Sequence, residues 1–191
     1  MGLLNLADWV DCTEVEGPGR RAALWVQGCT LRCQGCCNPH MMEIEPRYFI
    51  KADRVITWLH GVQNRHAIEG VTFLGGEPML QARGLAEVAS ACRGMGLSVI
   101  VFTGFTIEWL HEFLIPGAEQ LLAETDVLVD GPYIAEMRET ARNWVGSNNQ
   151  RFHFLTSRYT PEIVDDPTYA HGFELRVLRD GTIKGFGWPN D

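Results

Sequence analysis

Three cysteines in one short segment carry the clearest chemistry of this 191-residue sequence. Cys29, Cys33 and Cys36 follow the pattern C-x3-C-x2-C, directly after an apolar run from Arg21 to Gly28. Three thiolates this close together can bind three irons of a [4Fe–4S] cluster, for which a ferredoxin supplies four cysteines. The fourth iron is then open, and the amino and carboxylate groups of a methionine moiety can chelate it. A sulfonium held there lies next to a one-electron donor, as reductive cleavage of its S–C bond requires.

Cys37 leaves alternatives open in the same loop. It could replace Cys36 as the third ligand, although Cys36 keeps the expected spacing and Cys37 is then only its neighbour. Cys37 or His40 could also complete a zinc site, because zinc normally takes four ligands. Disulfides are disfavoured, since the N-terminus lacks the basic start and apolar stretch of a secretion signal. The same observation predicts a cytoplasmic protein.

A second motif follows about forty residues later. Gly75, Gly76, Glu77 and Pro78 come at the end of another apolar run. The carboxyl end of a parallel strand is where α/β sheets bind ligands, and two glycines let backbone carbonyls approach a ligand closely. A carbonyl or carboxylate at this place can accept hydrogen bonds from an ammonium group. Taken alone, the motif is equally typical of a turn before a helix.

Two further polar residues end the next two apolar runs. Thr103 follows the run from Leu97 to Phe102, and Asp130 follows the run from Val127 to Val129. If the sheet is parallel, both residues face the same rim as the first two motifs. Thr103 could contact a ribose or a methionine, and Asp130 could make a polar contact or bind a cation. A turn or a helix cap is an equally good interpretation of each.

Strands and helices must alternate to position these residues. Apolar spacing of i, i+3, i+4 and i+7 predicts helices, and short apolar runs predict buried strands. The predicted helices are 51–65, 81–95, 106–114 and 117–124, and the predicted strands are 21–28, 71–74, 97–102 and 127–129. This alternation is typical of βαβ units with a parallel sheet. We expect an α/β fold with four to six parallel core strands.

The end of the chain has a different character. Residues 151–155 (RFHFL) are predicted as one more strand, and the region 172–188 as an antiparallel hairpin around Asp180-Gly181. The hairpin could cover an open edge of the sheet, or it could shape a substrate pocket. A complete eight-stranded barrel usually needs about 250 residues, so an open, partial βα barrel is expected. The length fits one domain, residues 1–191.

Charge and composition exclude some classes of partner. The net charge is −8 with no basic stripe, which argues against a nucleic-acid backbone as the main partner. No run of eighteen or more apolar residues occurs, so no membrane span is expected.

The two motifs together resemble the radical S-adenosylmethionine superfamily. The C-x3-C-x2-C loop after the first core strand and the Gly-Gly-Glu motif that follows are the features of that resemblance. It implies a partial radical-S-adenosylmethionine barrel with a [4Fe–4S] cluster on the three cysteines. It also implies that contacts with S-adenosylmethionine fall on Gly75, Gly76, Glu77, Pro78, Thr103 and Asp130. Glu77 is expected to act structurally rather than by a direct bond to the cofactor.

Further segments are similar to the activating proteins of glycyl-radical enzymes, above all those of anaerobic ribonucleotide reductases. The segments are EGPGRR (16–21), the cysteine loop, GGEP, FTGF, VDGPY and GSNNQR (146–151). The similarity covers about 10–155, and about 156–191 is an extension that it does not include. Cys37 also departs from the family, which often has an aromatic residue at this position.

The resemblance implies a mechanism and its partners. A flavodoxin or ferredoxin-type reductant reduces the cluster, and S-adenosylmethionine is cleaved to methionine and a 5′-deoxyadenosyl radical. That radical removes a hydrogen atom from a glycine Cα of a partner glycyl-radical enzyme. One alternative is a radical enzyme that modifies a small metabolite or a peptide, similar to 7-carboxy-7-deazaguanine synthase. A second alternative is a non-enzymatic zinc or electron-transfer module.

Overall fold

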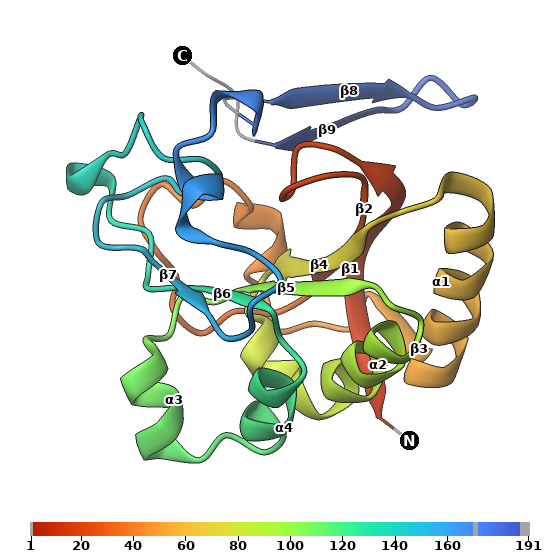
Figure 1. The fold of residues 1–191 in the computed structure, drawn as a ribbon, viewed down its shortest axis with the longest axis horizontal. Coiled ribbons are helices and arrows are strands. Elements are labelled where there is room, and N and C mark those ends of the chain that lie inside the picture. The colour runs from red at the N-terminus through yellow and green to blue at the C-terminus, as the bar shows by residue number, and fades with distance from the viewer. Residues whose placement is uncertain (1, 170–171, 188–191) are drawn as a thin grey trace.

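A mixed β-sheet forms the centre of the structure. The computed structural model describes residues 2–169 and 172–187, and Figure 1 shows the sheet with its helices. Its seven strands lie in the order β3 (Tyr48–Lys51), β1 (Leu3–Thr13), β2 (Arg21–Val26), β4 (Gly70–Gly75), β5 (Ser98–Phe102), β6 (Val127–Asp130) and β7 (Arg151–Phe154). Strands β2, β4, β5 and β6 are parallel, which confirms the predicted parallel core. β3 and β7 form the two edges, so the sheet is open.

Antiparallel strands flank this core on both sides. β1 pairs with β2 and β3, and β7 pairs with β6. The sequence predicts β7 but neither β1 nor β3. β1 has register irregularities between Leu6 and Asp8 and between Val10 and Thr13, which interrupt the alternation of apolar and polar residues that would reveal a strand. β3 is a four-residue edge strand, too short to give a pattern.

The helices lie on one face of the sheet (Figure 1). They are α1 (Ala52–His66), α2 (Ala82–Gly94), α3 (Ile107–Phe113) and α4 (Ala118–Ala123), each within one residue of its predicted bounds. Short 3-10 helices are η1 (Pro39–Met41), η2 (Pro78–Gln81), η3 (Ala135–Met137), η4 (Pro161–Val164) and η5 (Pro167–Tyr169). Thr106 caps α3, and its Oγ1 accepts a hydrogen bond from the backbone N–H of Trp109 at 3.3 Å.

The main hydrophobic core fills the space between these helices and the sheet. α1 contributes Val55, Leu59 and Val62 to this core, and the sheet contributes Phe73 of β4 and Leu128 of β6. All six residues of β2 are buried, because the opposite face of the sheet is also covered. On that second face, Met41 and Phe186 cluster with Ala23 and Trp25 of β2, and Val145 clusters with residues of β5 and β6. The chemistry-bearing loops therefore start from strands that are fixed on both faces.

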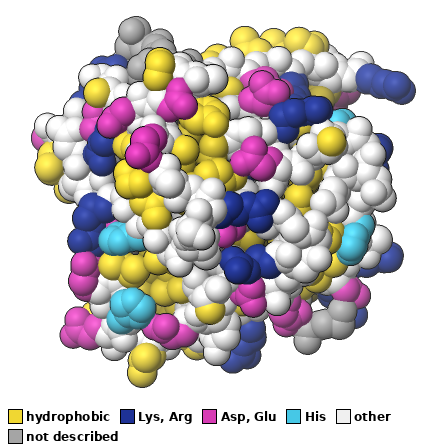
Figure 2. Space-filling model, in the orientation of Figure 1, with side chains coloured by type: hydrophobic (Ala, Val, Ile, Leu, Met, Phe, Trp, Pro, Cys, Tyr) yellow, Lys and Arg dark blue, Asp and Glu magenta, His cyan; other side chains and the backbone are white. Residues whose placement is uncertain are grey.

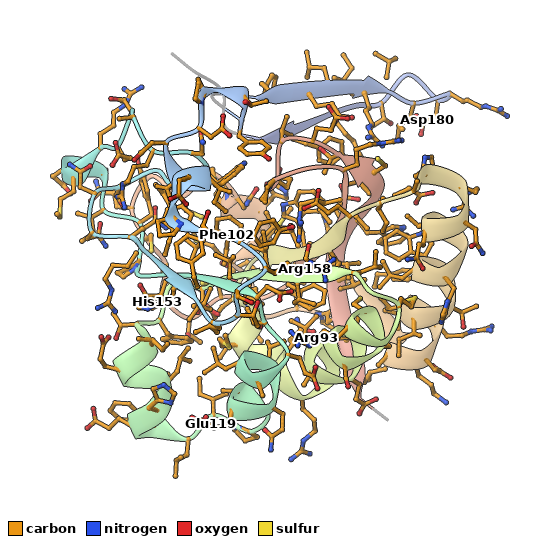
Figure 3. All side chains as sticks on the ribbon, viewed as in Figure 1. Arg93, Phe102, Glu119, His153, Arg158 and Asp180 are labelled. Atoms are coloured by element: carbon orange, nitrogen blue, oxygen red, sulfur yellow. The ribbon has the colours of Figure 1, made fainter. Side chains whose placement is uncertain are left out.

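The C-terminal hairpin is present but does not extend the main sheet. β8 (Phe173–Val177) and β9 (Ile183–Gly187) form a separate two-stranded sheet, with Asp180 at its projecting turn (Figure 3). The ring of Phe186 packs on Trp25, with centroids 5.3 Å apart. The hairpin therefore lies against the face of β1 and β2 rather than along an edge strand. The structure therefore does not show the hairpin covering an open edge of the main sheet, which was one of its two predicted roles.

Candidate functional site

The cysteine loop leaves the carboxyl end of β2 and returns to the same point. The backbone N–H of Gly28 donates to the carbonyl of Met41 at 2.8 Å, and that of Cys29 donates to Met42 at 2.9 Å. Gly28 has a φ of +98°, a conformation that favours glycine and turns the chain sharply out of the strand. These two hydrogen bonds close the base of the loop and hold it at the end of the parallel core.

Backbone amides surround the three cysteine sulfurs. Cys29 Sγ accepts hydrogen bonds from the N–H groups of Leu31 and Arg32, and Cys33 Sγ accepts one from Tyr133. Cys36 Sγ accepts one from Asn38 at 3.4 Å. Left-handed backbone at Arg32 (φ +49°) and Gly35 (φ +76°) turns the loop around the sulfurs. N–H donors of this kind stabilise negative charge on thiolates, as an iron–sulfur cluster requires.

The environments of the thiols differ. A hydrogen bond from the Cys37 thiol lowers the pKa of Cys36 to about 6, so Cys36 is the most readily deprotonated of the set. Burial raises the pKa of Cys29 and of Cys33, which therefore need a bound cation to stay deprotonated at neutral pH. The pKa of Cys37 itself is raised, mainly because its proton is held by Cys36. Cys37 thus acts on the loop as a hydrogen-bond donor to Cys36.

The glycine-rich loop after β4 is fastened directly to the base of the cysteine loop. Gly76 N–H donates to Val26 O at 2.8 Å, and Glu77 N–H donates to Gly28 O at 2.9 Å. A Cβ atom at Gly76 would lie 2.4 Å from the carbonyl oxygen of Gly28. At Gly75, where φ is +108°, a Cβ atom would lie 2.6 Å from the backbone N of Val26. Both glycines are required because the two loops touch through their backbones.

Glu77 links this loop to the next strand end. Its side chain is buried, and it accepts hydrogen bonds from the N–H of Met79 (2.8 Å), the hydroxyl of Thr103 (2.7 Å) and the N–H of Gly104 (2.9 Å). Burial raises the pKa of Glu77 to about 7, although these three donors partly oppose the shift. The carboxylate therefore links the ends of β4 and β5.

These loops open onto one cavity of about 870 Å³. Small-molecule sites usually have volumes of roughly 300–1,000 Å³. The predicted site residues that line the cavity are Cys29, Cys33, Cys36, Gly75, Gly76, Glu77 and Thr103. Pro78 and Asp130 are not among the lining residues; Pro78 is buried at the start of η2. The structure thus brings together seven of the nine predicted site residues.

The side chain of Asp130 makes its hydrogen bonds with other residues of the protein. Its side chain is fully buried and accepts hydrogen bonds from the N–H of Ile107 at 2.8 Å and from Arg151 at 2.6 and 3.0 Å. His153 Nε2 lies 3.0 Å from the same carboxylate. These contacts join β6 to the N-terminus of α3 and to β7. Asp130 thus binds the first backbone N–H of α3 and Arg151, and it is not among the residues that line the cavity.

The GSNNQR segment (146–151) also has its side chains engaged within the protein. Ser147 Oγ accepts a hydrogen bond from the N–H of Ile134 at 3.2 Å, and Asn149 Nδ2 donates to Pro132 O at 2.7 Å. Both contacts hold the loop that follows β6, which contributes to the wall of the cavity. The segment therefore supports the loop after β6, and its own Gly146 and Gln150 line the cavity.

The donor set fits a cluster better than a single ion. In residues 2–169 and 172–187, no three His, Cys, Asp or Glu side chains lie close enough together to hold one metal ion. A tetrahedral zinc site needs four ligands converging on one point. In a cluster each thiolate binds a different iron, so the sulfurs surround a wider space. Three free thiols on one cavity, each with backbone N–H donors, suit the second arrangement.

The aromatic residues in the wall of this cavity were not predicted from the sequence. They include Trp25 of β2, Tyr133, Trp144, Tyr169 and Phe186 of β9, which come from distant segments. Single aromatic residues scattered along a chain give no signal of a shared cavity. Glu16 also lines the cavity, and its place in the EGPGRR segment was the signal available for it. Burial raises the pKa of Glu16 to about 7, while its Oε1 accepts a hydrogen bond from Gly187 N–H at 2.7 Å.

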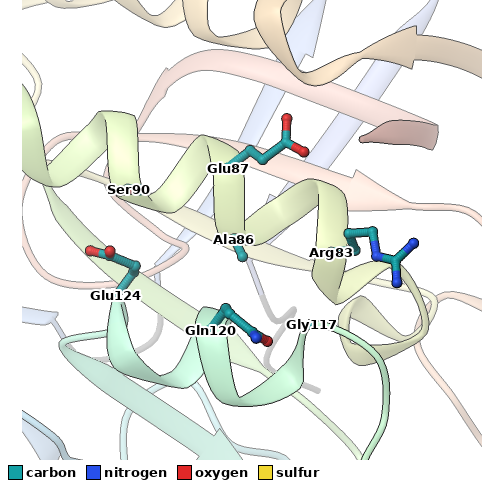
Figure 4. A pocket seen from close by; sticks show the side chains of 7 residues that line it. All are labelled: Arg83, Ala86, Glu87, Ser90, Gly117, Gln120 and Glu124. Carbon is teal, nitrogen blue, oxygen red and sulfur yellow. The ribbon is translucent and has the colours of Figure 1, made fainter. Parts of the chain in front are cut away.

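A second cavity lies between α2 and α4 (Figure 4). It is open to solvent, and the side chains around it, including Arg83, Glu87, Gln120 and Glu124, carry charges of both signs. No buried polar atom without a partner faces it among the described residues. It has none of the features of the cysteine-lined cavity.

Comparison with known proteins agrees with the geometry. Residues 15–153 match the family described as "4Fe-4S single cluster domain". The anaerobic ribonucleoside-triphosphate reductase-activating protein of Vibrio cholerae is 30% identical over 162 residues, covering 80% of this chain and 99% of that protein. The activating proteins of Escherichia coli K12 (80% and 99% covered) and of Enterobacteria phage T4 (73% and 87%) are each 28% identical.

None of the helices in the described parts of the chain is long and apolar enough to cross a membrane.

The similarity to each relative extends over most of both chains, and the family match includes all three cysteines and the glycine-rich loop. The chain therefore belongs to the 4Fe-4S single cluster domain family and, within it, to the anaerobic ribonucleoside-triphosphate reductase-activating proteins.

Proposed function

We propose that this chain is a radical S-adenosylmethionine enzyme that generates a glycyl radical on an anaerobic ribonucleotide reductase. In this proposal the open mixed sheet is the partial barrel of that superfamily. The whole chain is one domain, with a family-like core at about 10–155 and an extension at about 156–191. A flavodoxin or ferredoxin-type protein supplies the electron. One observation carries the proposal. Three cysteines, whose sulfurs accept hydrogen bonds from backbone N–H groups, line the same large cavity as the glycine-rich loop.

Cys29, Cys33 and Cys36 are the proposed ligands of the [4Fe–4S] cluster. Cluster and S-adenosylmethionine, when bound, supply one electron and a carbon-centred radical that removes a hydrogen atom from glycine. Gly75 and Gly76 are the proposed contacts for the amino end of S-adenosylmethionine, because their backbone lies beside the cysteine loop.

The remaining residues position these groups. Glu77 holds the glycine-rich loop and Thr103 in one arrangement through its three hydrogen bonds. Aromatic side chains in the cavity wall limit the access of water, which protects a radical from quenching. The cavity still opens to the surface, as a glycine on a partner protein needs in order to enter.

The test compares the wild-type protein with Cys29→Ala, Cys33→Ala, Cys36→Ala and Cys37→Ala after anaerobic reconstitution with iron and sulfide. We expect about four irons per chain in the wild type and in Cys37→Ala, and loss of the cluster in the other three. On reduction, the two cluster-containing proteins should form 5′-deoxyadenosine. With the reductase from the same organism, electron paramagnetic resonance should then detect a glycyl radical.

Two results would contradict the proposal. Bound zinc in place of iron, with no cleavage of S-adenosylmethionine, would make the chain a zinc module. Formation of 5′-deoxyadenosine without a glycyl radical on the reductase would favour a different substrate. The cavity of about 870 Å³ is large enough for a small metabolite, which is why that second candidate is kept.

A further inference from the structure

The C-terminal hairpin turns its charged side toward the protein. Lys184 pairs with Asp8 of β1, and Glu174 accepts a hydrogen bond from the hydroxyl of Thr13 at 2.7 Å. Arg176 pairs with Glu174 and donates a hydrogen bond to a backbone carbonyl of β1. These contacts fix which face of the hairpin points inward.

The outward face is apolar. Phe173, Leu175, Val177 and Ile183 are exposed by 47%, 63%, 72% and 65%. Figure 2 shows a row of hydrophobic side chains along this side of the molecule, over β8. A hairpin on a protein surface normally places its apolar residues inward, so this arrangement leaves hydrophobic surface in water. A contiguous exposed apolar patch of this kind marks a contact surface.

The apolar face is continuous with the mouth of the cysteine-lined cavity. Phe173 belongs to both, since it lines the cavity and begins the outward row on β8. Its ring lies over Gly185 on β9, where a Cβ atom would come within 2.9 Å of it. The row therefore runs from the cavity along the hairpin toward its turn at Asp180. A protein that inserts a segment into the cavity beside Phe173 would lie next to this row.

The hairpin lies outside the matched family region. The family match ends at residue 153, and the Vibrio cholerae protein is covered almost completely by 80% of this chain. The hairpin is therefore not part of the region that defines the family. Recognition of one particular partner is the kind of function that such an addition can supply.

We propose that the outward face of the hairpin (Phe173, Leu175, Val177 and Ile183) is a docking surface for the glycyl-radical enzyme that this chain activates. The proposal rests on the proposed function, because it needs a protein whose glycine enters the cavity. The partner contributes an apolar surface next to its glycine-bearing segment. Docking there places that segment at Phe173, the point where the hairpin meets the cavity.

The test uses the reconstituted full-length protein with the double substitution Leu175→Thr and Val177→Thr. Threonine keeps the preference for a strand but removes most of the apolar surface. The matched control is Leu114→Asn, because Leu114 is 73% exposed at the end of α3, on the opposite side of the molecule (Figure 1). Leu114 has a φ of +46°, which asparagine tolerates.

We expect the double variant to raise the KM for the reductase at least tenfold in glycyl-radical formation. Cleavage of S-adenosylmethionine without the reductase should stay within twofold of wild type in both variants. A benzophenone side chain in place of Leu175 should crosslink to the reductase, whereas one in place of Leu114 should not. The crosslink tests the surface without requiring the double variant to fold normally.

An unchanged KM together with no crosslink at position 175 would overturn the docking proposal. A crosslink from position 175 to a second copy of this chain would also overturn it, because the row would then be a dimer interface. Failure of the proposed function itself would look different: S-adenosylmethionine cleavage would be missing from the wild type and from every variant.

Discussion

The contact between the glycine-rich loop and the cysteine loop can be tested by a single methyl group. Gly76→Ala places a Cβ atom 2.4 Å from the carbonyl oxygen of Gly28 and 2.9 Å from that of Met41. Both neighbours are backbone atoms, so no side chain can rotate away. Because separations below 3.0 Å hardly occur for a Cβ atom, the two loops must move apart by at least about 0.6 Å.

The free-energy cost follows from the bonds at this contact. The movement weakens the hydrogen bonds from Glu77 N–H to Gly28 O and from Gly76 N–H to Val26 O, which are 2.9 and 2.8 Å long. Each is worth about 1 kcal/mol, and forced overpacking adds about 1–3 kcal/mol. We therefore expect Gly76→Ala to lower the free energy of unfolding by about 2–4 kcal/mol. It should also lower iron loading, because the same bonds hold the base of the cysteine loop.

The matched control is Gly94→Ala in the last turn of α2. Nothing lies within 4 Å of a Cβ atom at Gly94, and alanine is a better helix former than glycine. Chemical denaturation followed by circular dichroism gives the free energy of unfolding, and iron analysis after reconstitution gives the loading. The control should equal or slightly exceed wild type in both. If Gly76→Ala also stays within about 0.5 kcal/mol of wild type and loads the same iron, the contact does not have the role assigned to it.

Three further predictions concern buried polar groups. Asp130→Asn should lower the free energy of unfolding by about 2–3 kcal/mol, because the buried side chain loses its ionic contacts. The affinity for S-adenosylmethionine, measured by calorimetry, should stay within twofold of wild type. A tenfold weaker affinity would show that Asp130 takes part in binding the cofactor. Glu16 has a folded-state pKa of about 7 against a usual 4.5, so the folded state binds its proton more tightly and stability falls as pH rises from about 4.5 to 7. Between pH 5.0 and 7.5, urea unfolding should show a loss of stability that is larger in the wild type than in Glu16→Gln by up to about 3 kcal/mol, because Glu77, whose pKa is also about 7, titrates in both proteins. Equal losses in the two proteins would refute the prediction. Arg21→Met should lower the free energy of unfolding in urea by about 3–5 kcal/mol, because the buried guanidinium donates hydrogen bonds to five separate residues. Arg158→Met at the surface should lower it by less than about 1 kcal/mol. Similar losses in the two variants would contradict this account.

The features that sequence analysis predicted well are local ones. The helices α1 to α4 follow from apolar spacing within single segments, and the hairpin turn from Asp180-Gly181. The cysteine loop is equally local, because Cys29, Cys33 and Cys36 lie within eight residues and their spacing alone predicts a shared ligand.

The features that it could not predict depend on contacts between distant segments. Asp130 shows this: its position at a strand end predicts a place at the ligand-binding rim, but the side chain turns to Ile107 and Arg151, which are 23 and 21 residues away. The hairpin shows it again. Alternation along 173–187 gives two opposite faces, and only Asp8 and Thr13, more than 150 residues away, decide which of them points inward.

The amino-acid sequence by itself determined the helices, the parallel core strands and the likeness of two short motifs to a cluster-binding family, because each depends on residues that are neighbours in the chain. The tertiary structure alone decided that these motifs touch through the backbones of Gly28 and Gly76, and that an aromatic wall completes the cavity. It also decided that the hairpin exposes its apolar side. The reason is physical: hydrogen bonding and packing between segments far apart in the sequence fix the direction of each side chain, and the local pattern carries no record of those partners.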